Sequence, residues 1–201
     1  MNLSVRMIVV LTVVGLISGS LLAVVGMLTK DRIAFNKQQE IKAAILEVVP
    51  GTETSEEVFT EKNFTIYSGK NRDGNLIGYA VYTSGTGFQD IISLMFGTDP
   101  NITKINSLSI LEQKETPGLG AKITDKEAFL KFWDNKDAGR ALSLRKPAAH
   151  SQDELAPNEV NTITGATISS DKVLSIVNQS LEKLKQMKQA GKLISEENDA
   201  E

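Results

Sequence analysis

The feature that most constrains this chain of 201 residues is an uncharged stretch close to its N-terminus. Between Met7 and Leu28 there is no charged side chain and no proline. About 20 consecutive apolar residues are enough for a helix to cross the hydrocarbon core of a bilayer. A cleavable signal peptide has a shorter apolar core, of roughly 7–15 residues. We therefore expect a retained membrane-spanning helix, with most of the chain folded outside the bilayer.

The charges that flank this stretch give a first expectation about orientation. Arg6 precedes it, whereas the residues that follow include Lys30, Arg32, Lys37 and Lys42. Lysine and arginine near the ends of a span favour the cytoplasmic side. Taken alone, the count places the larger part of the chain in the cytoplasm, while the lack of cysteine mildly favours the opposite side.

Composition excludes several classes of function. The net charge is −3 and aromatic residues make up 5% of the chain, so no basic surface or stacking platform for nucleic acid is expected. Without cysteine, the chain cannot hold iron–sulfur clusters or zinc through thiolates. Its single histidine, His150, gives little support for a histidine-rich metal site or a catalytic triad. We predict no catalytic residue and no metal site, so any redox chemistry needs a cofactor held by other means.

The remaining sequence predicts an α+β fold. A helix is expected over 31–49, and a second helix over 170–187 has apolar residues at helical spacing. Between them, short apolar segments joined by turns predict a mainly antiparallel sheet flanked by helices. The segments are 64–67, 76–83, 90–97 and 102–111, followed by a short helix over 125–133 and a candidate strand over 141–144.

The chain is therefore expected to contain a short N-terminal tail, one transmembrane helix, a connecting helix and loop, a single domain and an acidic tail. The expected bounds are 1–6, 7–28, 29–62, 63–188 and 189–201, in that order.

A threonine hydroxyl stands just before the second helix, in the stretch Thr164-Gly-Ala-Thr167. The two small residues leave the hydroxyl of Thr167 sterically open, and a helix N-terminus favours an anion beside it. This is the geometry needed to carry a phosphate ester. The alternative is that Thr167 only caps the helix, a frequent role for threonine, although Ser169 or Ser170 could provide that cap instead.

A second unusual stretch runs from Glu115 to Lys122, with the sequence Glu-Thr-Pro-Gly-Leu-Gly-Ala-Lys. Gly118 and Gly120 permit backbone conformations that other residues avoid, and they let a flat ligand approach the main chain. Lys122 is close enough in sequence to meet an anion or an electron-rich ring edge. The alternative is an ordinary Pro-Gly turn.

Both stretches, in this order and about fifty residues apart behind a single anchor, resemble the FMN-binding-domain family. The similarity extends to Gly78-Tyr-Ala-Val-Tyr82 and Gly85-Thr-Gly-Phe-Gln-Asp90, and it covers the chain from the anchor to about residue 187. Within this family the chain resembles the G subunit of the Rnf electron-transport complex. The C subunit of the sodium-pumping NADH:quinone reductase is a relative of that protein and is usually longer.

The resemblance implies that FMN is attached through its phosphate, as a phosphoester, to Thr167. It also implies a flavin transferase outside the cytoplasm, which makes this bond. The domain is then expected on the periplasmic or extracellular side of the cell (inner) membrane. This contradicts the charge count, and we follow the resemblance. The family often has aspartate six residues before the modified threonine, where this chain has Asn161, so slower modification is expected.

The resemblance further implies which residues hold FMN. The expected residues are Thr164, Gly165, Ala166 and Thr167 at the phosphate, and Thr116, Pro117, Gly118, Leu119 and Gly120 along the isoalloxazine ring, with Glu115 and Lys122 beside them.

The implied function is electron relay within an Rnf-type complex that couples ferredoxin:NAD⁺ electron transfer to Na⁺ or H⁺ translocation. The other membrane and peripheral subunits of the complex are the expected partners, and this chain alone catalyses no reaction. Two alternatives stay open. One is the C subunit of the quinone reductase, and the other is a non-redox membrane-anchored binding module.

Overall fold

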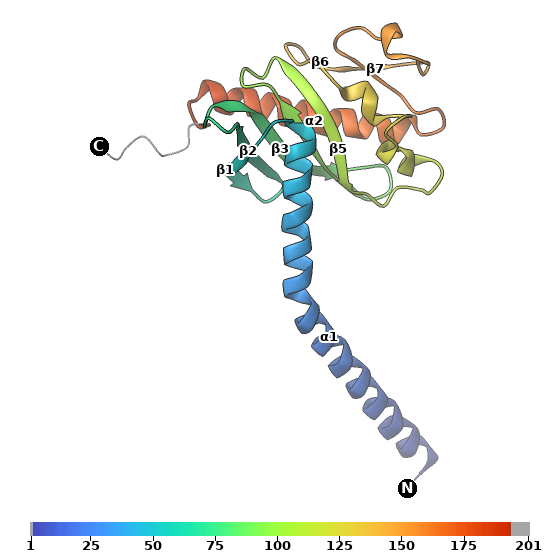
Figure 1. Ribbon diagram of the computed structural model, residues 1–201. Helices are drawn as coiled ribbons and strands as arrows, with labels where there is room; N and C mark the ends of the chain where they lie inside the picture. Colours follow the sequence, from blue (N-terminus) through green and yellow to red (C-terminus); the bar gives the residue numbers. More distant parts are fainter. Residues whose placement is uncertain (1, 194–201) are drawn as a thin grey trace, which may run out of the picture. The chain divides into compact units, whose positions relative to one another are not determined.

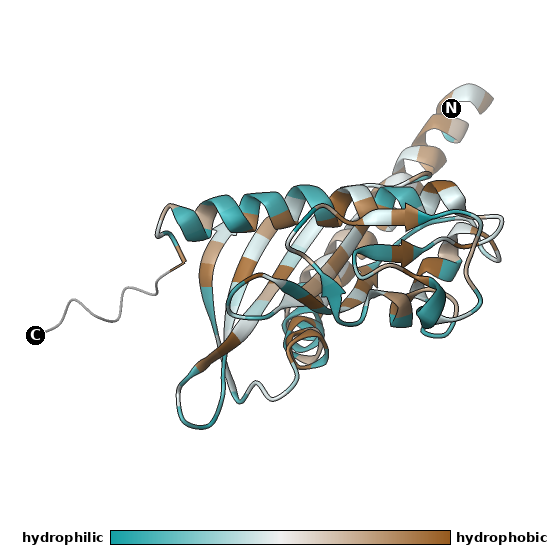
Figure 2. Cartoon of the chain, turned by 90° about the horizontal axis from the view of Figure 1, so that it is seen from above, coloured by the Kyte–Doolittle hydropathy of each residue, from teal (hydrophilic) through white to brown (hydrophobic). Residues whose placement is uncertain are grey.

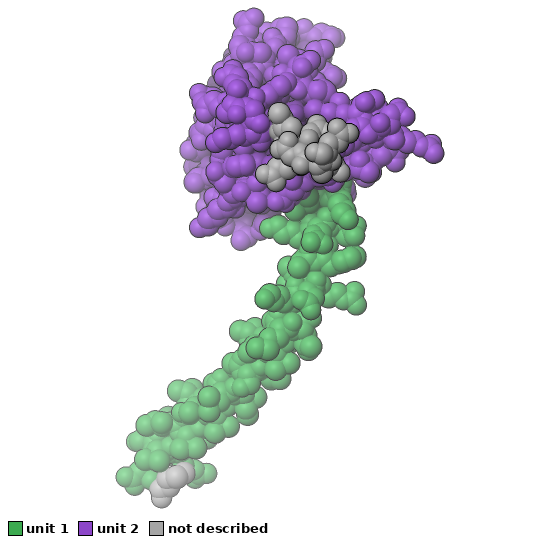
Figure 3. All heavy atoms as spheres, turned by 90° about the vertical axis from the view of Figure 1, so that its left-hand side faces the viewer, with its two compact units in different colours: residues 1–42 green, residues 43–201 purple. Residues whose placement is uncertain are grey.

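The computed structural model describes residues 2–193 and separates into two compact units, residues 1–42 and 43–201 (Figure 3). The first unit consists of most of helix α1 (Leu3–Val48) (Figure 1). The second contains the end of α1 and the elements that follow it. The acidic tail expected over 189–201 lies outside the described residues from residue 194 onward.

Helix α1 is the one helix within residues 2–193 that is long and apolar enough to cross a membrane. The hydroxyl of Thr12 donates to the carbonyl of Ile8 at 2.9 Å, and that of Thr29 donates to the carbonyl of Val25 at 2.8 Å. These bonds satisfy polar groups that lipid could not. The helix expected over 31–49 is continuous with this span, because no proline interrupts the chain before Pro50.

The second unit is built on a six-stranded sheet in which every strand is antiparallel to its neighbours. In chain order and in space, the strands are β1 (Thr54–Glu61), β2 (Phe64–Lys70), β3 (Leu76–Thr86), β4 (Ile91–Thr98), β5 (Lys104–Glu112) and β6 (Lys136–Asp137). The prediction of an α+β fold with a mainly antiparallel sheet is confirmed. The shorter elements are two parallel strands, β7 (Ser143–Arg145) and β8 (Glu159–Asn161), and the 3-10 helices η1 (Gly120–Thr124), η2 (Leu130–Trp133) and η3 (Gln152–Glu154).

Helix α2 (Thr167–Gln189) covers one face of the sheet (Figure 2). Its apolar residues recur at three- and four-residue spacing, which places them on one side of the helix. Val173, Val177, Leu181 and Leu184 are buried in one core with residues of β2 and β4, among them Ile66, Leu94 and Phe96. Burial of each side chain of this size contributes about 1.5–3 kcal/mol.

The last turn of α1 covers the other face. Side chains alternate between the two faces along β4. Leu94 and Phe96 meet α2 on one face, so Met95 and position 97 belong to the other face. A Cβ atom placed on Gly97 would lie 1.8 Å from the backbone oxygen of Val48. Glycine is therefore required at this position for α1 to end so close to the sheet.

The short helix expected over 125–133 is present only in part, as the 3-10 helix η2 at its end. The segment consists of turns followed by η2, and its backbone N–H groups bond to carbonyls three, four and five residues back. Phe129 and Trp133 are fully buried, with their ring centroids 5.8 Å apart in an edge-to-face arrangement. The packing of these rings in the core overrides the local helical preference.

The turn between β4 and β5 is held by the carboxylate of Asp99. Oδ1 accepts the N–H groups of Thr103 at 2.6 Å and Lys104 at 2.8 Å, and Oδ2 accepts the hydroxyl of Thr103 at 2.8 Å. Partial burial alone would raise the pKa of Asp99, but these hydrogen bonds outweigh it and hold the pKa below its ordinary value. Such a carboxyl stabilises the fold above its unfolded-state pKa, and the stabilisation is lost as the pH falls through the folded-state pKa.

We predict that Asp99→Asn lowers the free energy of unfolding at neutral pH by up to about 1 kcal/mol, since water screens this partly exposed group. The difference from the parent protein should shrink as the pH falls below 3.8, the ordinary pKa of the group, because the aspartate is then protonated. Urea unfolding at several pH values, followed by the fluorescence of the single tryptophan, measures this. A pH-independent loss would contradict the prediction.

Candidate functional site

The two stretches singled out in the sequence meet at one cavity of about 370 Å³. Three parts of the second unit line it: the turn between β3 and β4, the segment that follows β5, and the turn before α2 together with the first turn of that helix. The lining residues are Phe88, Glu115, Thr116, Leu119, Gly120, Gly165, Ala166, Thr167, Ile168 and Ser169. Seven of them were predicted from the sequence, so a single cavity accounts for most of the expected residues.

Four of the predicted residues do not line this cavity. Pro117 and Gly118 are exposed at the centre of a turn, and Thr164 is exposed in a second turn. Lys122 is exposed in η1. Their proposed contacts with a ligand stay predictions.

The segment after β5 is folded by the Pro-Gly turn. The N–H of Leu119 donates to the carbonyl of Thr116 at 3.1 Å, and Gly118 has a φ of 75°. Proline followed by a glycine with positive φ is the pattern of a type II turn. The hydroxyl of Thr116 donates to the side-chain oxygen of Gln89 at 2.9 Å, which connects this segment to the turn between β3 and β4.

A second turn directs the chain into α2. The N–H of Ala166 donates to the carbonyl of Ile163 at 2.9 Å, and Gly165 has a φ of 84°. A Cβ on Gly165 would have Leu119 as its nearest neighbour, at an ordinary contact distance of 3.6 Å, so glycine is needed here for its backbone conformation and not for space. The turn places Ala166 as the N-cap residue and Thr167 as the first residue of the helix. Thr167 is therefore not the helix cap.

The hydroxyl of Thr167 is available for chemistry. It is partly exposed, it lines the cavity, and it has no hydrogen-bond partner within residues 2–193. Helix α2 also lacks a side-chain cap, so the N–H groups of its first turn keep their capacity to bind an anion. The positive end of the helix dipole adds to this preference.

The two serines that follow do not cap the helix either. Ser169 Oγ donates to Glu115 Oε2 at 2.7 Å. Ser170 Oγ donates to the carbonyl of Ala166 at 3.1 Å and accepts the N–H of Ile163 at 3.1 Å. Both serine hydroxyls are thus used within the protein, whereas the hydroxyl of Thr167 is not.

Three large apolar side chains border the cavity and remain half-exposed. Phe88, Leu119 and Ile168 keep 61%, 51% and 54% of their surface. Together they offer a surface to which a flat apolar or aromatic group could bind. We did not predict Phe88 or Ile168 as site residues, although the sequence contains one indication that Ile168 is exposed. Ile168 precedes Val177 by nine residues, which places it about 180° around the helix from the buried side.

Asn161 lies in β8 and does not line the cavity. Its side chain is buried and paired with the main chain of Ala149. Nδ2 donates to the carbonyl at 2.9 Å, and Oδ1 accepts the N–H at 2.8 Å. An ionised aspartate could not make the first of these bonds, so asparagine suits this environment. The slower modification expected from Asn161 stays a prediction.

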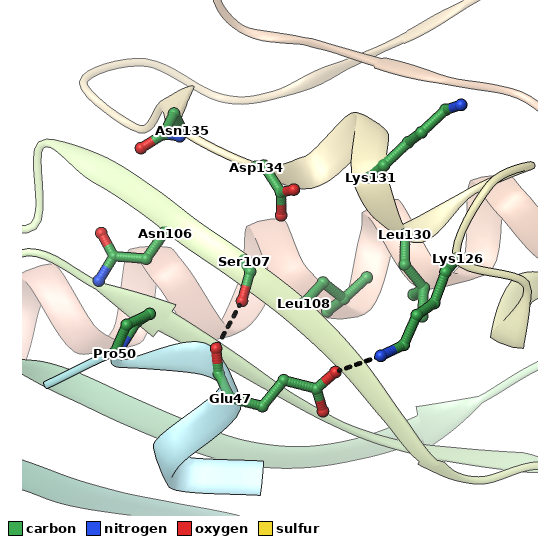
Figure 4. A pocket seen from close by; sticks show the side chains of 10 residues that line it. All are labelled: Glu47, Pro50, Asn106, Ser107, Leu108, Lys126, Leu130, Lys131, Asp134 and Asn135. Carbon is green, nitrogen blue, oxygen red and sulfur yellow. Dashed lines mark hydrogen bonds and ion pairs between the residues drawn. The ribbon is translucent and has the colours of Figure 1, made fainter. Parts of the chain in front are cut away.

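A second cavity, of about 630 Å³, lies beside the end of α1 (Figure 4). The carboxylate of Glu47 lies 3.5 Å from the Nζ atom of Lys126 and accepts the hydroxyl of Ser109 at 2.9 Å. Burial raises the pKa of Asp134, Glu47 raises it further, and Lys136 opposes both effects. None of the residues predicted for a site lines this cavity. Despite its larger volume, it is therefore the weaker candidate.

Residues 2–193 contain no group of three or more histidine, aspartate or glutamate side chains placed to hold a metal ion. Glu115 is the one ionisable residue among those that line the smaller cavity. The chemistry that the cavity offers from its own residues is thus one free hydroxyl, a helix N-terminus, an apolar border and a buried carboxylate.

Comparisons with known proteins show that these residues belong to one known domain. The family model of the FMN-binding domain matches residues 87–182, a range that contains every lining residue. The chain is 28% identical over 184 residues to the G subunit of the ion-translocating oxidoreductase complex of Methanosarcina acetivorans, covering 88% of this chain and 92% of that protein.

A second relative is the G subunit of the Na⁺-translocating ferredoxin:NAD⁺ oxidoreductase complex of Acetobacterium woodii. It is 30% identical over 154 residues, which cover 72% of this chain and 70% of that protein. Among solved structures, NqrC from Shewanella oneidensis matches with a TM-score of 0.52 and 21% identity, covering 70% of this chain and 73% of that chain. This last similarity shows a common fold.

Proposed function

Because the chain belongs to the FMN-binding-domain family that includes the G subunits of ion-translocating oxidoreductase complexes, we propose that Thr167 carries FMN as a phosphoester. Helix α1 anchors the protein in the membrane, and the protein is then an electron carrier of such a complex. The observation that carries the proposal is the hydroxyl of Thr167. It lines the cavity at the start of α2 and has no partner within the described residues.

The residues around the cavity fit a flavin nucleotide. The uncapped N–H groups of α2 stand beside Thr167 and suit a phosphate. The half-exposed side chains of Phe88, Leu119 and Ile168 suit the apolar part of an isoalloxazine ring. A Cβ on Gly120 would lie 2.6 Å from the Ser169 hydroxyl, so glycine at this position lets the start of η1 pack closely against the first turn of α2 at the cavity.

The attachment step balances without an oxidant or a reductant. The Oγ1 atom of Thr167 would form a bond to the phosphorus of an activated flavin phosphate and release its proton, while the bond from that phosphorus to the leaving group of the donor breaks. No base within hydrogen-bond distance of Thr167 is present in the described part of the chain. We therefore propose that a flavin transferase supplies the donor and the catalysis.

Bound FMN supplies one- and two-electron transfer, while the protein holds and tunes it. The tether on Thr167 prevents loss of the flavin to the medium outside the cell membrane. The Acetobacterium relative is named as part of a complex that couples ferredoxin:NAD⁺ electron transfer to Na⁺ translocation. We propose that this chain relays electrons in a complex of that kind, which moves Na⁺ or H⁺, with its other membrane and peripheral subunits as partners.

Two other functions have less support. The C subunit of a quinone reductase would use the same chemistry, but the similarity to NqrC extends only to the fold. The proteins that co-purify with the chain from its native membrane separate these two complexes. A non-redox binding module needs Thr167 as a helix cap, whereas Ala166 occupies the N-cap position.

The proposed attachment is tested by producing the full chain in membranes with and without an active flavin transferase. With the transferase, we expect the intact mass to rise by FMN less one water, and the denatured protein band to fluoresce under ultraviolet light. An unmodified mass in the presence of the active transferase would contradict the proposal.

We propose that the second unit faces the periplasmic or extracellular side, where the transferase acts. The chain has no cysteine, so a single introduced cysteine provides the one thiol of the protein that a maleimide can label. Asp73→Cys places one in the exposed turn between β2 and β3. We expect a membrane-impermeant maleimide to label this variant in intact spheroplasts.

The matched control is Ser4→Cys, which lies on the other side of the uncharged stretch. It should be labelled only after the membrane is permeabilised. The reverse pattern would place the second unit in the cytoplasm, as the charge count suggests, and would refute this part of the proposal.

A further inference from the structure

Glu115 is a buried carboxylate that joins three separate parts of the site. Only 4% of its surface is exposed. Oε1 accepts the N–H groups of Phe88 at 2.8 Å and Gln89 at 3.1 Å, and Oε2 accepts the hydroxyl of Ser169 at 2.7 Å. One side chain thus connects the turn between β3 and β4, the segment after β5 and the first turn of α2.

The surrounding backbone is shaped to admit this carboxylate. A Cβ on Gly87 would lie 2.4 Å from Oε1 of Glu115, and a Cβ on Gly120 would lie 2.7 Å from Oε2. Real side chains do not come this close to their neighbours, so both positions require glycine while Glu115 is present. The N–H of Glu115 in turn donates to the side-chain oxygen of Gln113 at 2.7 Å, which fixes the backbone at this point. Both carboxylate oxygens and the backbone N–H of Glu115 thus form hydrogen bonds within the protein.

The charge of Glu115 is not matched by a cation. Glu115 forms no ion pair in the described part of the chain, and three hydrogen-bond donors and the positive end of α2 are what stabilise it. It also lines the cavity in which we place FMN. Because Glu115 itself is buried, its negative charge is only partly screened by water, and such a charge opposes the addition of electrons to a nearby ring.

We propose that Glu115 is a positioning residue, and not a direct ligand of FMN, which holds the three segments in the shape needed for flavin attachment and lowers the flavin's tendency to accept electrons. This inference rests on the proposed function, because it assumes that the cavity holds FMN. It assigns Glu115 two separable effects, one through its shape and one through its charge.

The two effects are separated by Glu115→Gln and Glu115→Ala in the full chain. Glutamine keeps the shape, since its oxygen can accept the N–H groups of Phe88 and Gln89 while its amide donates to Ser169. Alanine removes both the bonds and the charge. Glu112→Gln is the matched control, because this exposed residue at the end of β5 does not line the cavity.

Each variant is produced with an active flavin transferase, and the flavinylated fraction is measured by intact mass. We expect Glu115→Gln and Glu112→Gln to reach the parent level and Glu115→Ala to fall several-fold. The bound flavin is then titrated against a reference dye of known potential. Loss of the charge in Glu115→Gln should raise the ratio of reduced to oxidised flavin at fixed potential by about tenfold, whereas Glu112→Gln should leave it unchanged.

The outcomes are distinguishable. If the parent chain gains no flavin, the proposed function fails and the inference fails with it. If the parent is flavinylated, the inference is overturned by full flavinylation of Glu115→Ala, or by a titration of Glu115→Gln that superimposes on that of Glu112→Gln. If Glu115→Ala does not fold, as judged by tryptophan fluorescence, the titration of Glu115→Gln decides. A purely structural role would not change the potential.

Discussion

Replacing Thr167 by alanine is expected to abolish covalent flavin attachment while leaving the fold intact. The substitution removes the one hydroxyl of the α2 first turn that has no partner in the described part of the chain, so no internal hydrogen bond is lost. The phosphorus–oxygen bond then has no oxygen to form on. Intact mass and in-gel fluorescence after production with the flavin transferase measure the outcome, and Thr167→Ser, which restores a hydroxyl, should restore attachment.

A matched control is Ser175→Ala, which removes an exposed hydroxyl from the same helix outside the cavity. This variant should be flavinylated as fully as the parent chain. Retention of flavin by Thr167→Ala would refute the assignment and make the exposed hydroxyl of Thr164 the next candidate. Loss of flavin in both alanine variants would show that the transferase recognises the helix as a whole.

The second large effect is expected for Gly97→Ala, which should strongly destabilise the second unit. The added methyl group would lie 1.8 Å from the backbone oxygen of Val48, so the end of α1 must move away from β4. Overpacking of a core costs about 1–3 kcal/mol or more. Because backbone blocks the methyl group here, we expect a loss of about 3 kcal/mol or more in the free energy of unfolding.

Urea unfolding of the detergent-solubilised chain, produced without the transferase and followed by the fluorescence of Trp133, measures this loss. Gly139→Ala is the comparison. The added Cβ would lie 3.0 Å from a side-chain oxygen of Asp137, which can move, and the position is exposed. That change should alter the free energy of unfolding by no more than about 0.5 kcal/mol. If the two variants unfold at the same urea concentration, the end of α1 does not lie as close to Gly97 as this contact requires.

Local sequence was sufficient to predict the Pro-Gly turn and the open hydroxyl of Thr167, but not the turn that precedes α2. Gly118 follows proline and Gly165 precedes a helix, and both adopt the positive φ that glycine favours. The α+β fold followed from apolar periodicity, because the buried side of α2 and the alternating strands repeat within a few residues. Structural features that depend on residues close to one another in the sequence could therefore be predicted from the sequence.

Contacts between distant residues were not accessible in this way. Glu115 was expected among the residues that hold FMN, and that expectation stays a prediction. The sequence did not indicate that its oxygens accept hydrogen bonds from groups 26, 27 and 54 positions away. No local pattern encodes such a partnership. The segment 125–133 shows the same limit, because its helical pattern yields to the packing of Phe129 against Trp133.

The close fit of Glu115 between two glycines has a consequence for how this domain can diverge. A Cβ at position 87 would also lie 2.6 Å from the backbone oxygen of Asp90, and one at position 120 would lie 2.6 Å from the Ser169 hydroxyl, so a shorter side chain at position 115 alone would not admit a larger residue at either glycine. A shorter side chain would in turn leave the main chain of residues 88 and 89 without its acceptor. Natural variants should therefore keep glycine at positions 87 and 120 even where position 115 has changed.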